Sequence, residues 1–151
     1  NGQEVKGTLQ KGYLSIDRRW KKGDVVEIHF DMQPRVVKAN DKVAADRGRV
    51  AIERGPLVYC AEWPDNDFNI STLLLNRHPK FQLVERPDLL GGINEITTRA
   101  QALSYDATGR LATKDVKLTL IPYYAWAHRG EGRMEVWLPI EVGAASAELQ
   151  E

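Results

Sequence analysis

Apolar and polar residues alternate along much of the chain, and alternation with a period of two is typical of β-strands that have one buried face. Residues 25–32 show the pattern most clearly, because Val26, Ile28 and Phe30 fall on one face with polar residues between them. The same alternation, rich in β-branched and aromatic residues, recurs in five other runs: 14–16, 50–52, 81–83, 116–120 and 134–138. The sequence therefore predicts a protein built from short β-strands.

Turn residues separate these runs, so neighbouring strands are expected to pair as antiparallel hairpins. Residues 21–24 (Lys-Lys-Gly-Asp) predict one turn and residues 106–109 (Asp-Ala-Thr-Gly) predict another. The 7 prolines fall at or near the edges of the runs, where proline costs no ladder hydrogen bond. Since no long amphipathic helix is present, the pattern favours an all-β antiparallel sandwich or barrel. We expect a jelly-roll-like sandwich with little helix.

Two stretches of the chain fit more than one secondary structure, and a third marks a candidate domain boundary. Residues 68–75 fit either a strand or a short helical turn, and the Ala- and Glu-rich residues 143–151 fit a helical turn or a frayed end. Residues 63–67 (Trp-Pro-Asp-Asn-Asp) are polar and contain a proline, so they are the best candidate boundary. We therefore expect two small sandwich units, residues 1–62 and residues 63–151.

Composition and charge exclude several classes of partner. The 151 residues are 42% hydrophobic, and a globule of about 150 residues buries roughly 70% of its unfolded surface. Lys plus Arg and Asp plus Glu both number 21, which argues against a nucleic-acid binder or a polybasic membrane anchor. No apolar run approaches the roughly 20 residues of a membrane-spanning helix. Residues 1–4 show no signal-peptide pattern and no initiator methionine, so we expect a piece of a longer protein whose location stays open.

Metal and cofactor chemistry has little support in the sequence. Cys60 is the one cysteine, which excludes an internal disulfide and a zinc site built from several thiolates. It lies in an apolar run, so we expect a small buried apolar side chain. The histidines, His29, His78 and His128, show no paired metal-ligand spacing, and His29 is expected on the solvated face of its strand. No glycine-rich phosphate loop is present.

Carboxylates on the predicted strands are candidate catalytic groups, because most glycoside hydrolases use a pair of them about 5–10 Å apart. Four could face one another across strands: Asp17, Glu27, Asp31 and Glu53. Charges that alternate with apolar residues are, however, the ordinary solvent face of a sheet. We therefore expect no catalytic residue, no metal ligand and no cofactor in this chain.

Aromatic residues are the more promising candidates for contacts, and they are densest just after the 116–120 run. Tyr123, Tyr124 and Trp126 could stack on the apolar face of a sugar, or fill the core or an interdomain seam, which we favour. Arg129 could stack on a ring or pair with a carboxylate, and His128 could donate to a carbonyl. These five residues are the candidate sugar-contact or interdomain residues.

A second notable segment is Arg54, Gly55 and Pro56, for which we expect a structural role. Glycine before proline favours an extended or positive-φ backbone, so the chain is expected to bend sharply there before it enters a buried strand.

Three long segments resemble the motifs of one family. They read GYLSIDRRWKKGD over residues 12–24, RVAIERGPLVYC over 49–60 and LIPYYAWAHRG over 120–130. They are similar to the motifs G-Y-x-x-I-x-R-x-W-x-x-G-D, R-V-A-x-x-R-G-P-L-V-Y-C and I-P-Y-Y-A-W-A-N-R-G of glycoside hydrolase family 127, the β-L-arabinofuranosidase-like proteins. His128 stands where asparagine is commoner.

The resemblance implies an accessory region and not the catalytic part. Proteins of this family resemble an (α/α)6 barrel followed by two β-sandwich modules, and residues 1–62 and 63–139 are similar to the later half of the middle module and to the C-terminal module. The nucleophile implied for the family is a barrel cysteine in a zinc site, and Cys60 does not match it. The first module would then lack a strand, so we expect another chain to fill the gap or residues 1–12 to be rearranged.

The resemblance also implies partners. One is the absent catalytic barrel, on which this region would pack to support the sugar site or a dimer interface. The others are a second copy of the protein and arabinose-containing glycans. A free-standing carbohydrate-binding module is the alternative.

Overall fold

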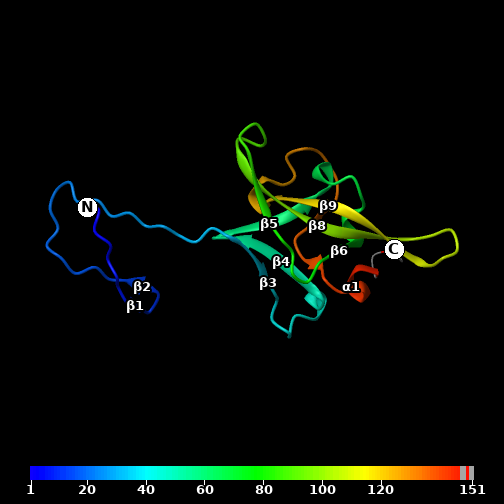
Figure 1. The fold of residues 1–151 in the computed structure, drawn as a ribbon, viewed down its shortest axis with the longest axis horizontal. Helices are drawn as coiled ribbons and strands as arrows, with labels where there is room; N and C mark the ends of the chain where they lie inside the picture. Colours follow the sequence, from blue (N-terminus) through cyan, green and yellow to red (C-terminus); the bar gives the residue numbers. More distant parts are fainter. Residues whose placement is uncertain (147–148, 150–151) are drawn as a thin grey trace. The chain divides into compact units, whose positions relative to one another are not determined.

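The computed structural model describes residues 1–146 and 149, and these form β-strands joined by turns and a few short helices (Figure 1). The chain divides into two compact units, Asn1–Asp31 and Met32–Glu151. No helix in the described part is long and apolar enough to cross a membrane. The expectation of an all-β antiparallel fold with little helix is confirmed.

The smaller unit is a short hairpin with a loop that polar contacts close. Strands β1 (Leu9–Gln10) and β2 (Tyr13–Leu14) pair antiparallel across a tight turn in which Lys11 and Gly12 have φ of 51° and 84°. The predicted turn at 21–24 is present, because the Asp24 amide donates to the Lys21 carbonyl over 3.1 Å. The Asp24 carboxylate also accepts from the Asn1 side chain at 2.7 Å, so these contacts tie the start of the chain to this turn.

The strand predicted over residues 25–32 is wrong. The structure gives this segment no strand, and Val26, Ile28 and Phe30 are 52%, 69% and 75% exposed. A β-strand is stable only when a neighbour completes its hydrogen-bond ladder and covers its apolar face. No described strand pairs with these residues, so the alternating pattern lacks the partner that it requires.

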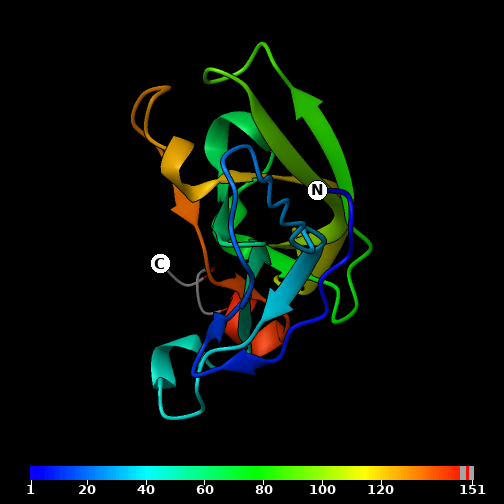
Figure 2. The same ribbon diagram turned by 90° about the vertical axis from the view of Figure 1, so that its left-hand side faces the viewer.

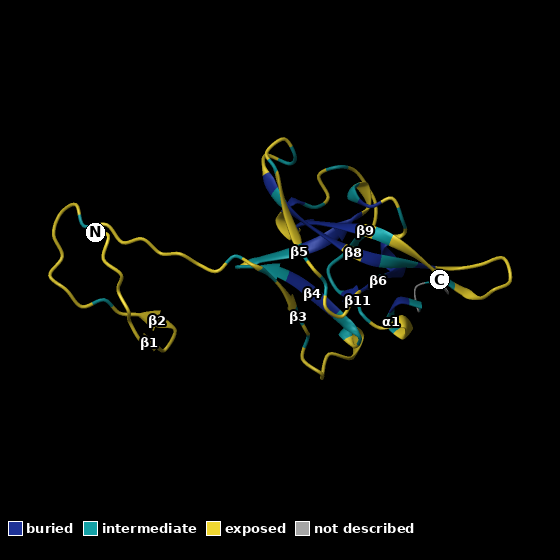
Figure 3. Cartoon of the chain, in the orientation of Figure 1, coloured by how far each residue is buried: buried dark blue, intermediate teal, exposed yellow. Residues whose placement is uncertain are grey.

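The larger unit is built on one nine-stranded antiparallel sheet whose main path runs β11-β4-β5-β9-β8-β6. Three further strands join this path: β3 pairs with β4, β7 with β8 and β10 with β5. The sheet curls, so β11 lies beside β6 as well as pairing with β4 (Figure 3). The strand bounds are β3 Pro34–Val37, β4 Arg49–Arg54, β5 Leu57–Glu62, β6 Leu73–Leu75, β7 Gln82–Arg86, β8 Ile93–Tyr105, β9 Leu111–Pro122, β10 Met134–Glu135 and β11 Leu138–Pro139.

Short helical turns connect the strands. They are the 3-10 turns η1 (Ala44–Asp46), η2 (Trp63–Asp65), η3 (Ile70–Thr72) and η4 (Tyr123–Ala125), and the helix α1 (Val142–Ser146), which lies against β6 and β11 (Figure 2). Both alternatives for residues 68–75 occur, because η3 is followed directly by β6. The predicted helical turn in the tail is α1, whereas residues 147, 148, 150 and 151 lie outside the described residues.

The core lies inside the curl of the sheet (Figure 3). Alternate residues of β4, β5, β8 and β9 point into it, as the pleat of a strand requires. Its fully buried side chains include Ile52, Tyr59, Ile96, Leu118 and Leu120. A smaller cluster of Cys60, Ile93, Ile121 and Ala125 is buried in addition to this core, because the next residues of the same strands point the other way.

The predicted boundary between residues 62 and 63 does not agree with the structure. Strand β5, which ends at Glu62, pairs with β9 and β10, so residues on both sides of that point share one core. The polar stretch 63–67 is a turn inside the unit, and Asn66 in it is 7% exposed. The Asn66 amide donates to the Glu62 and Thr119 carbonyls at 2.8 and 3.0 Å, so this polar residue joins strands instead of separating domains. The division falls after Asp31, and one curled sheet replaces the two small sandwiches expected.

Candidate interdomain and sugar-contact site

The aromatic segment that follows β9 forms a rigid turn with its tyrosines facing outward. Ala125 of η4 is 4% exposed, whereas Tyr123 and Tyr124 are 43% and 61% exposed. Trp126 is half-buried and packs on the smaller buried cluster. The ring centroids of Tyr123 and Trp126 are 6.2 Å apart, with a 39° angle between the ring planes. The segment therefore presents two exposed rings from an anchored backbone, but not a flat stacking platform.

Arg129 anchors this segment to the end of β5. Its guanidinium donates from Nη1 to Asp65 Oδ1 at 2.6 Å and from Nη2 to Asp65 Oδ2 at 2.5 Å. Nη2 also donates to Glu62 Oε2. The other oxygen of Glu62, Oε1, accepts from the backbone amide of Ala127 at 2.8 Å. We call Glu62, Asp65 and Arg129 the arginine clamp.

The clamp is largely shielded from solvent, so its charges depend on one another. The side chains of Glu62, Asp65 and Arg129 are 2%, 9% and 20% exposed. The hydrogen bonds to Asp65, and then those to Glu62, raise the pKa of Arg129 further above its ordinary range. A charged group this deeply buried is tolerated only when it is paired and hydrogen-bonded. The clamp therefore fixes the turn that carries the two tyrosines.

Cys60 lies on β5, two residues before Glu62 of the clamp, and its thiol is held in the unreactive protonated form. Burial, followed by the nearby carboxylates of Glu62 and Asp65, raises the pKa of the Cys60 thiol to about 12. The thiol is free and fully buried. Because a thiolate is the reactive form, the structure agrees with a packing role and not with a nucleophile.

His128 and the segment Arg54–Pro56 occupy turns. The Nδ1 atom of His128 is 3.1 Å from the Ala125 carbonyl oxygen, so the tautomer with a proton on Nδ1 donates to it. Arg54 is the last residue of β4, and Gly55 and Pro56 form the turn to β5, where Gly55 has φ of 57°. A Cβ at Gly55 would lie 2.3 Å from the sulfur of Met32, which explains why glycine stands there.

The carboxylates considered for catalysis are divided between the two units. Asp17, Glu27 and Asp31 belong to the smaller unit, whereas Glu53 lies on β4 and accepts from Arg35 Nη2 at 2.8 Å. Among residues 1–146 and 149, no group of three His, Cys, Asp or Glu residues is placed to hold a metal ion.

Glu62 and Asp65 are site residues that sequence reasoning missed. Their spacing of three residues across a turn is a weak signal of a shared partner. Nothing in the sequence links them to Arg129, which lies 67 and 64 residues further along. Only the pairing of β5 with β9 and β10 brings the two stretches together.

Comparison with known protein families matches almost the whole described chain. Residues 34–139 match the model of the glycoside hydrolase family 127 C-terminal domain, and residues 1–32 match that of the β-L-arabinofuranosidase middle domain of the same family. The chain belongs to glycoside hydrolase family 127. The junction of the two matches agrees with the division after Asp31.

Individual relatives show how much of a family 127 protein this chain represents. A non-reducing end β-L-arabinofuranosidase of Bifidobacterium longum subsp. longum is 35% identical over 91% of this chain and 23% of its own length. A solved family 127 β-arabinofuranosidase is 71% identical with a TM-score of 0.92, over 95% of this chain and 23% of that chain. The β-L-arabinofuranosidase Ara127N-Se of Geobacillus stearothermophilus T6 is 40% identical with a TM-score of 0.85, over 92% and 23%. The chain thus spans about a quarter of the length of these relatives.

Proposed function

We propose that this chain is the non-catalytic accessory region of a β-L-arabinofuranosidase-like glycoside hydrolase and packs on the (α/α)6 catalytic barrel of that enzyme. The observation that carries the proposal is the match of its two parts to the middle and C-terminal domains of family 127, over 23% of the length of the relatives. The zinc that the family resemblance implies would lie in the barrel, so the proposal assigns no metal or cofactor to this chain.

The face that meets the barrel is the turn that carries Tyr123 and Tyr124. Support comes from their exposure, 43% and 61%, on a backbone that the arginine clamp and buried Ala125 hold in place. Large exposed rings on a rigid turn are typical of surfaces that become buried in an interface. Interfaces between domains of one chain commonly bury about 600–1,500 Å², and two tyrosines would form the centre of such a patch.

A chimera tests this proposal. In the 71% identical β-arabinofuranosidase, the region aligned with this chain is replaced by this chain, and Tyr124→Ala is compared with Tyr105→Ala. Tyr105 is a matched control, since it is 48% exposed at the far end of β8. Full burial of a large apolar side chain is worth about 1.5–3 kcal/mol, so Tyr124→Ala should lower stability by roughly that amount and Tyr105→Ala by far less.

Kinetic measurements on the same chimera distinguish packing of the tyrosines on the barrel from contact of the tyrosines with the sugar. If the tyrosines pack on the barrel, Tyr124→Ala lowers the unfolding midpoint and leaves KM for an aryl β-L-arabinofuranoside unchanged. If they form the rim of the sugar site, KM rises while the midpoint stays. Equal behaviour of the two alanine variants in both assays would contradict the proposal, as would turnover of the same substrate by the isolated chain.

A second copy of the protein is the other partner that we propose for this region. Sedimentation of the chimera and its Tyr124→Ala variant tests whether the same face forms a dimer. A dimer that dissociates only in the tyrosine variant would assign the face to self-association and not to the barrel.

A free-standing carbohydrate-binding module is the second candidate, and the exposure of Tyr124 favours it. The 39° angle between the Tyr123 and Trp126 planes weighs against it, because sugar platforms need coplanar rings. Calorimetric titration with arabinose-containing oligosaccharides decides between them: heat that Tyr124→Ala abolishes would support the module, and its absence leaves the accessory role.

A further inference from the structure

A groove on the larger unit gathers positive charge that the proposed function does not use. It has a volume of about 770 Å³ and lies over β8 and β9, with β7 and the β6–β7 connection as its rim. Its cationic lining consists of Lys80 on that connection, Arg99 on β8 and Lys117 on β9. His78 lies beside them. We call this the basic groove.

Two cations of the basic groove are placed directly against each other, and none of its three cations is in an ion pair within the described residues. Arg99 and Lys117 are directly opposite in the β8–β9 register, and like charges in such a pair destabilise a sheet. Neither they nor Lys80 forms an ion pair with a carboxylate of residues 1–146 or 149. The acidic residue of the lining, Asp115, accepts a hydrogen bond from Gln101 at 3.4 Å. A like-charge pair that destabilises the sheet and forms no ion pair is expected where a protein binds an anion.

The neutral residues of the groove define the kind of anion. Asn76 and Gln82 present exposed amides, which are groups that hydrogen-bond sugar hydroxyls, whereas Thr97 and Thr98 are only 3% and 6% exposed. No Phe, Tyr or Trp lines the groove among the described residues, so the large rings that stack on a neutral sugar are not present there.

We propose that the basic groove binds an acidic glycan, an oligosaccharide that bears uronate carboxylates. The carboxylates lie between Arg99, Lys117 and Lys80, and the neighbouring hydroxyls reach the amide side chains of Asn76 and Gln82. The choice of a glycan over another polyanion rests on the proposed function, which places this chain on a glycan-degrading enzyme. The groove does not include Tyr123, Tyr124 or the arginine clamp, so the two proposals use separate surfaces.

Titration of the chain with a defined galacturonate oligomer tests the proposal, by calorimetry and by backbone amide NMR. We expect the amide shifts to map to the groove and the binding to weaken as salt rises from about 50 to about 500 mM, because exposed charges are screened. The methyl-esterified oligomer keeps the hydroxyls and loses the carboxylates, so it should not bind. Equal binding of the ester would overturn the proposal, and so would a fully saturating titration of the chain by a glutamate peptide at equal affinity.

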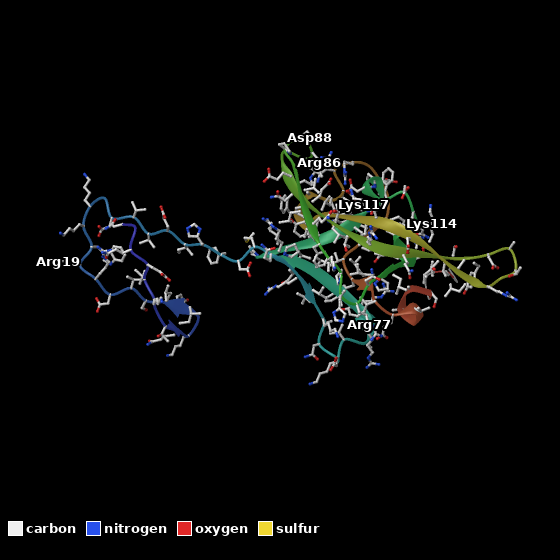
Figure 4. The ribbon with its side chains drawn as sticks, viewed as in Figure 1. Arg19, Arg77, Arg86, Asp88, Lys114 and Lys117 are labelled. Carbon is white, nitrogen blue, oxygen red and sulfur yellow. The ribbon has the colours of Figure 1, made fainter. Side chains whose placement is uncertain are left out.

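Variants on β8 and β9 test the site, and a matched variant outside the groove provides the control. Arg99→Gln and Lys117→Gln should each weaken binding by about fivefold, the upper range for an exposed charge pair, and the double variant by more. Lys114→Gln removes the same charge from β9 three residues away, outside the groove lining (Figure 4), and should leave the affinity unchanged. An equal loss in Lys114→Gln would show unspecific charge attraction and overturn the site.

Unfolding of the variants cannot mimic these results. Removing one charge from the opposed Arg99–Lys117 pair relieves repulsion, so both variants should melt at or above the temperature of the unchanged chain. Failure of glycan binding is also distinguishable from failure of the accessory role, because a groove that binds no glycan leaves the result of the tyrosine chimera unchanged.

Discussion

Replacing Arg129 with methionine should destabilise the larger unit more than any surface substitution of the same kind. It would leave the Glu62 carboxylate, which is 2% exposed, with the Ala127 amide at 2.8 Å as its remaining donor among the described residues. Loss of one partner of a buried ion pair costs about 3–5 kcal/mol. Arg129 retains 20% exposure and water can partly replace it, so we expect the lower end, about 3 kcal/mol. Domains of this size are stable by only about 5–15 kcal/mol.

Urea unfolding measured by circular dichroism provides the assay. The midpoint should fall while the slope with denaturant stays constant, since the surface exposed on unfolding is unchanged. Arg77→Met is the matched control, because Arg77 pairs with Glu141 over 3.5 Å with side-chain exposures of 69% and 56%. An ion pair this exposed contributes at most about 1 kcal/mol.

A double variant separates lost charge pairing from lost packing. Glu62→Gln combined with Arg129→Met removes the charges of Glu62 and Arg129 and leaves Asp65 as it is in Arg129→Met, and a neutral amide is less costly to bury than an unpaired carboxylate. The double variant should therefore be more stable than Arg129→Met alone. Equal losses in Arg129→Met and Arg77→Met, or a double variant less stable than the single one, would refute the assignment of the clamp.

Two further predictions concern Cys60 and Gly55. Burial raises the pKa of Cys60 from 9.0 to about 12, so the folded chain should resist thiol reagents at about pH 8, and rapid labelling would contradict this. The contribution of the Cys60 thiol to the free energy of unfolding should be complete below about pH 9 and lost as the pH rises toward 12. Gly55→Ala should cost about 1–2 kcal/mol, because φ is 57° and the new Cβ would lie 2.3 Å from the Met32 sulfur. Gly109→Ala, with φ of 75° and nothing within 4 Å, should cost less, and equal urea midpoints for both variants would show that the Met32 contact is unimportant.

Local patterns predicted β4, β7 and β9, which have partners within the chain, but not β3 or β8, which are also paired. The turn at 106–109 is one example: the Asp106 side chain accepts from the Thr108 and Arg110 amides at 2.8 and 3.0 Å, which is local chemistry that residue type alone reveals. The 25–32 run shows the limit, because alternation records a tendency and a strand also needs a neighbour. The apolar residues Val26, Ile28 and Phe30 are exposed for that reason.

Contacts between distant residues were beyond the reach of the sequence. Residues 63–67 resemble a linker because they are polar, yet Asn66 is buried and its Oδ1 accepts from the Thr119 amide at 2.9 Å. The arginine clamp and the opposed Arg99 and Lys117 likewise depend on the strand register. Family motifs could identify the chain, but they could not place these side chains.

Solvent labelling of the tyrosines tests most directly whether this chain is the accessory region that packs on a catalytic barrel. Hydroxyl-radical labelling is measured by mass spectrometry for the isolated chain and for the chimera with the β-arabinofuranosidase relative. Tyr123 and Tyr124, which are 43% and 61% exposed here, should be labelled strongly in the isolated chain and protected in the chimera, whereas Tyr105 should be labelled in both. Equal labelling of Tyr123 and Tyr124 in the two samples would contradict the account.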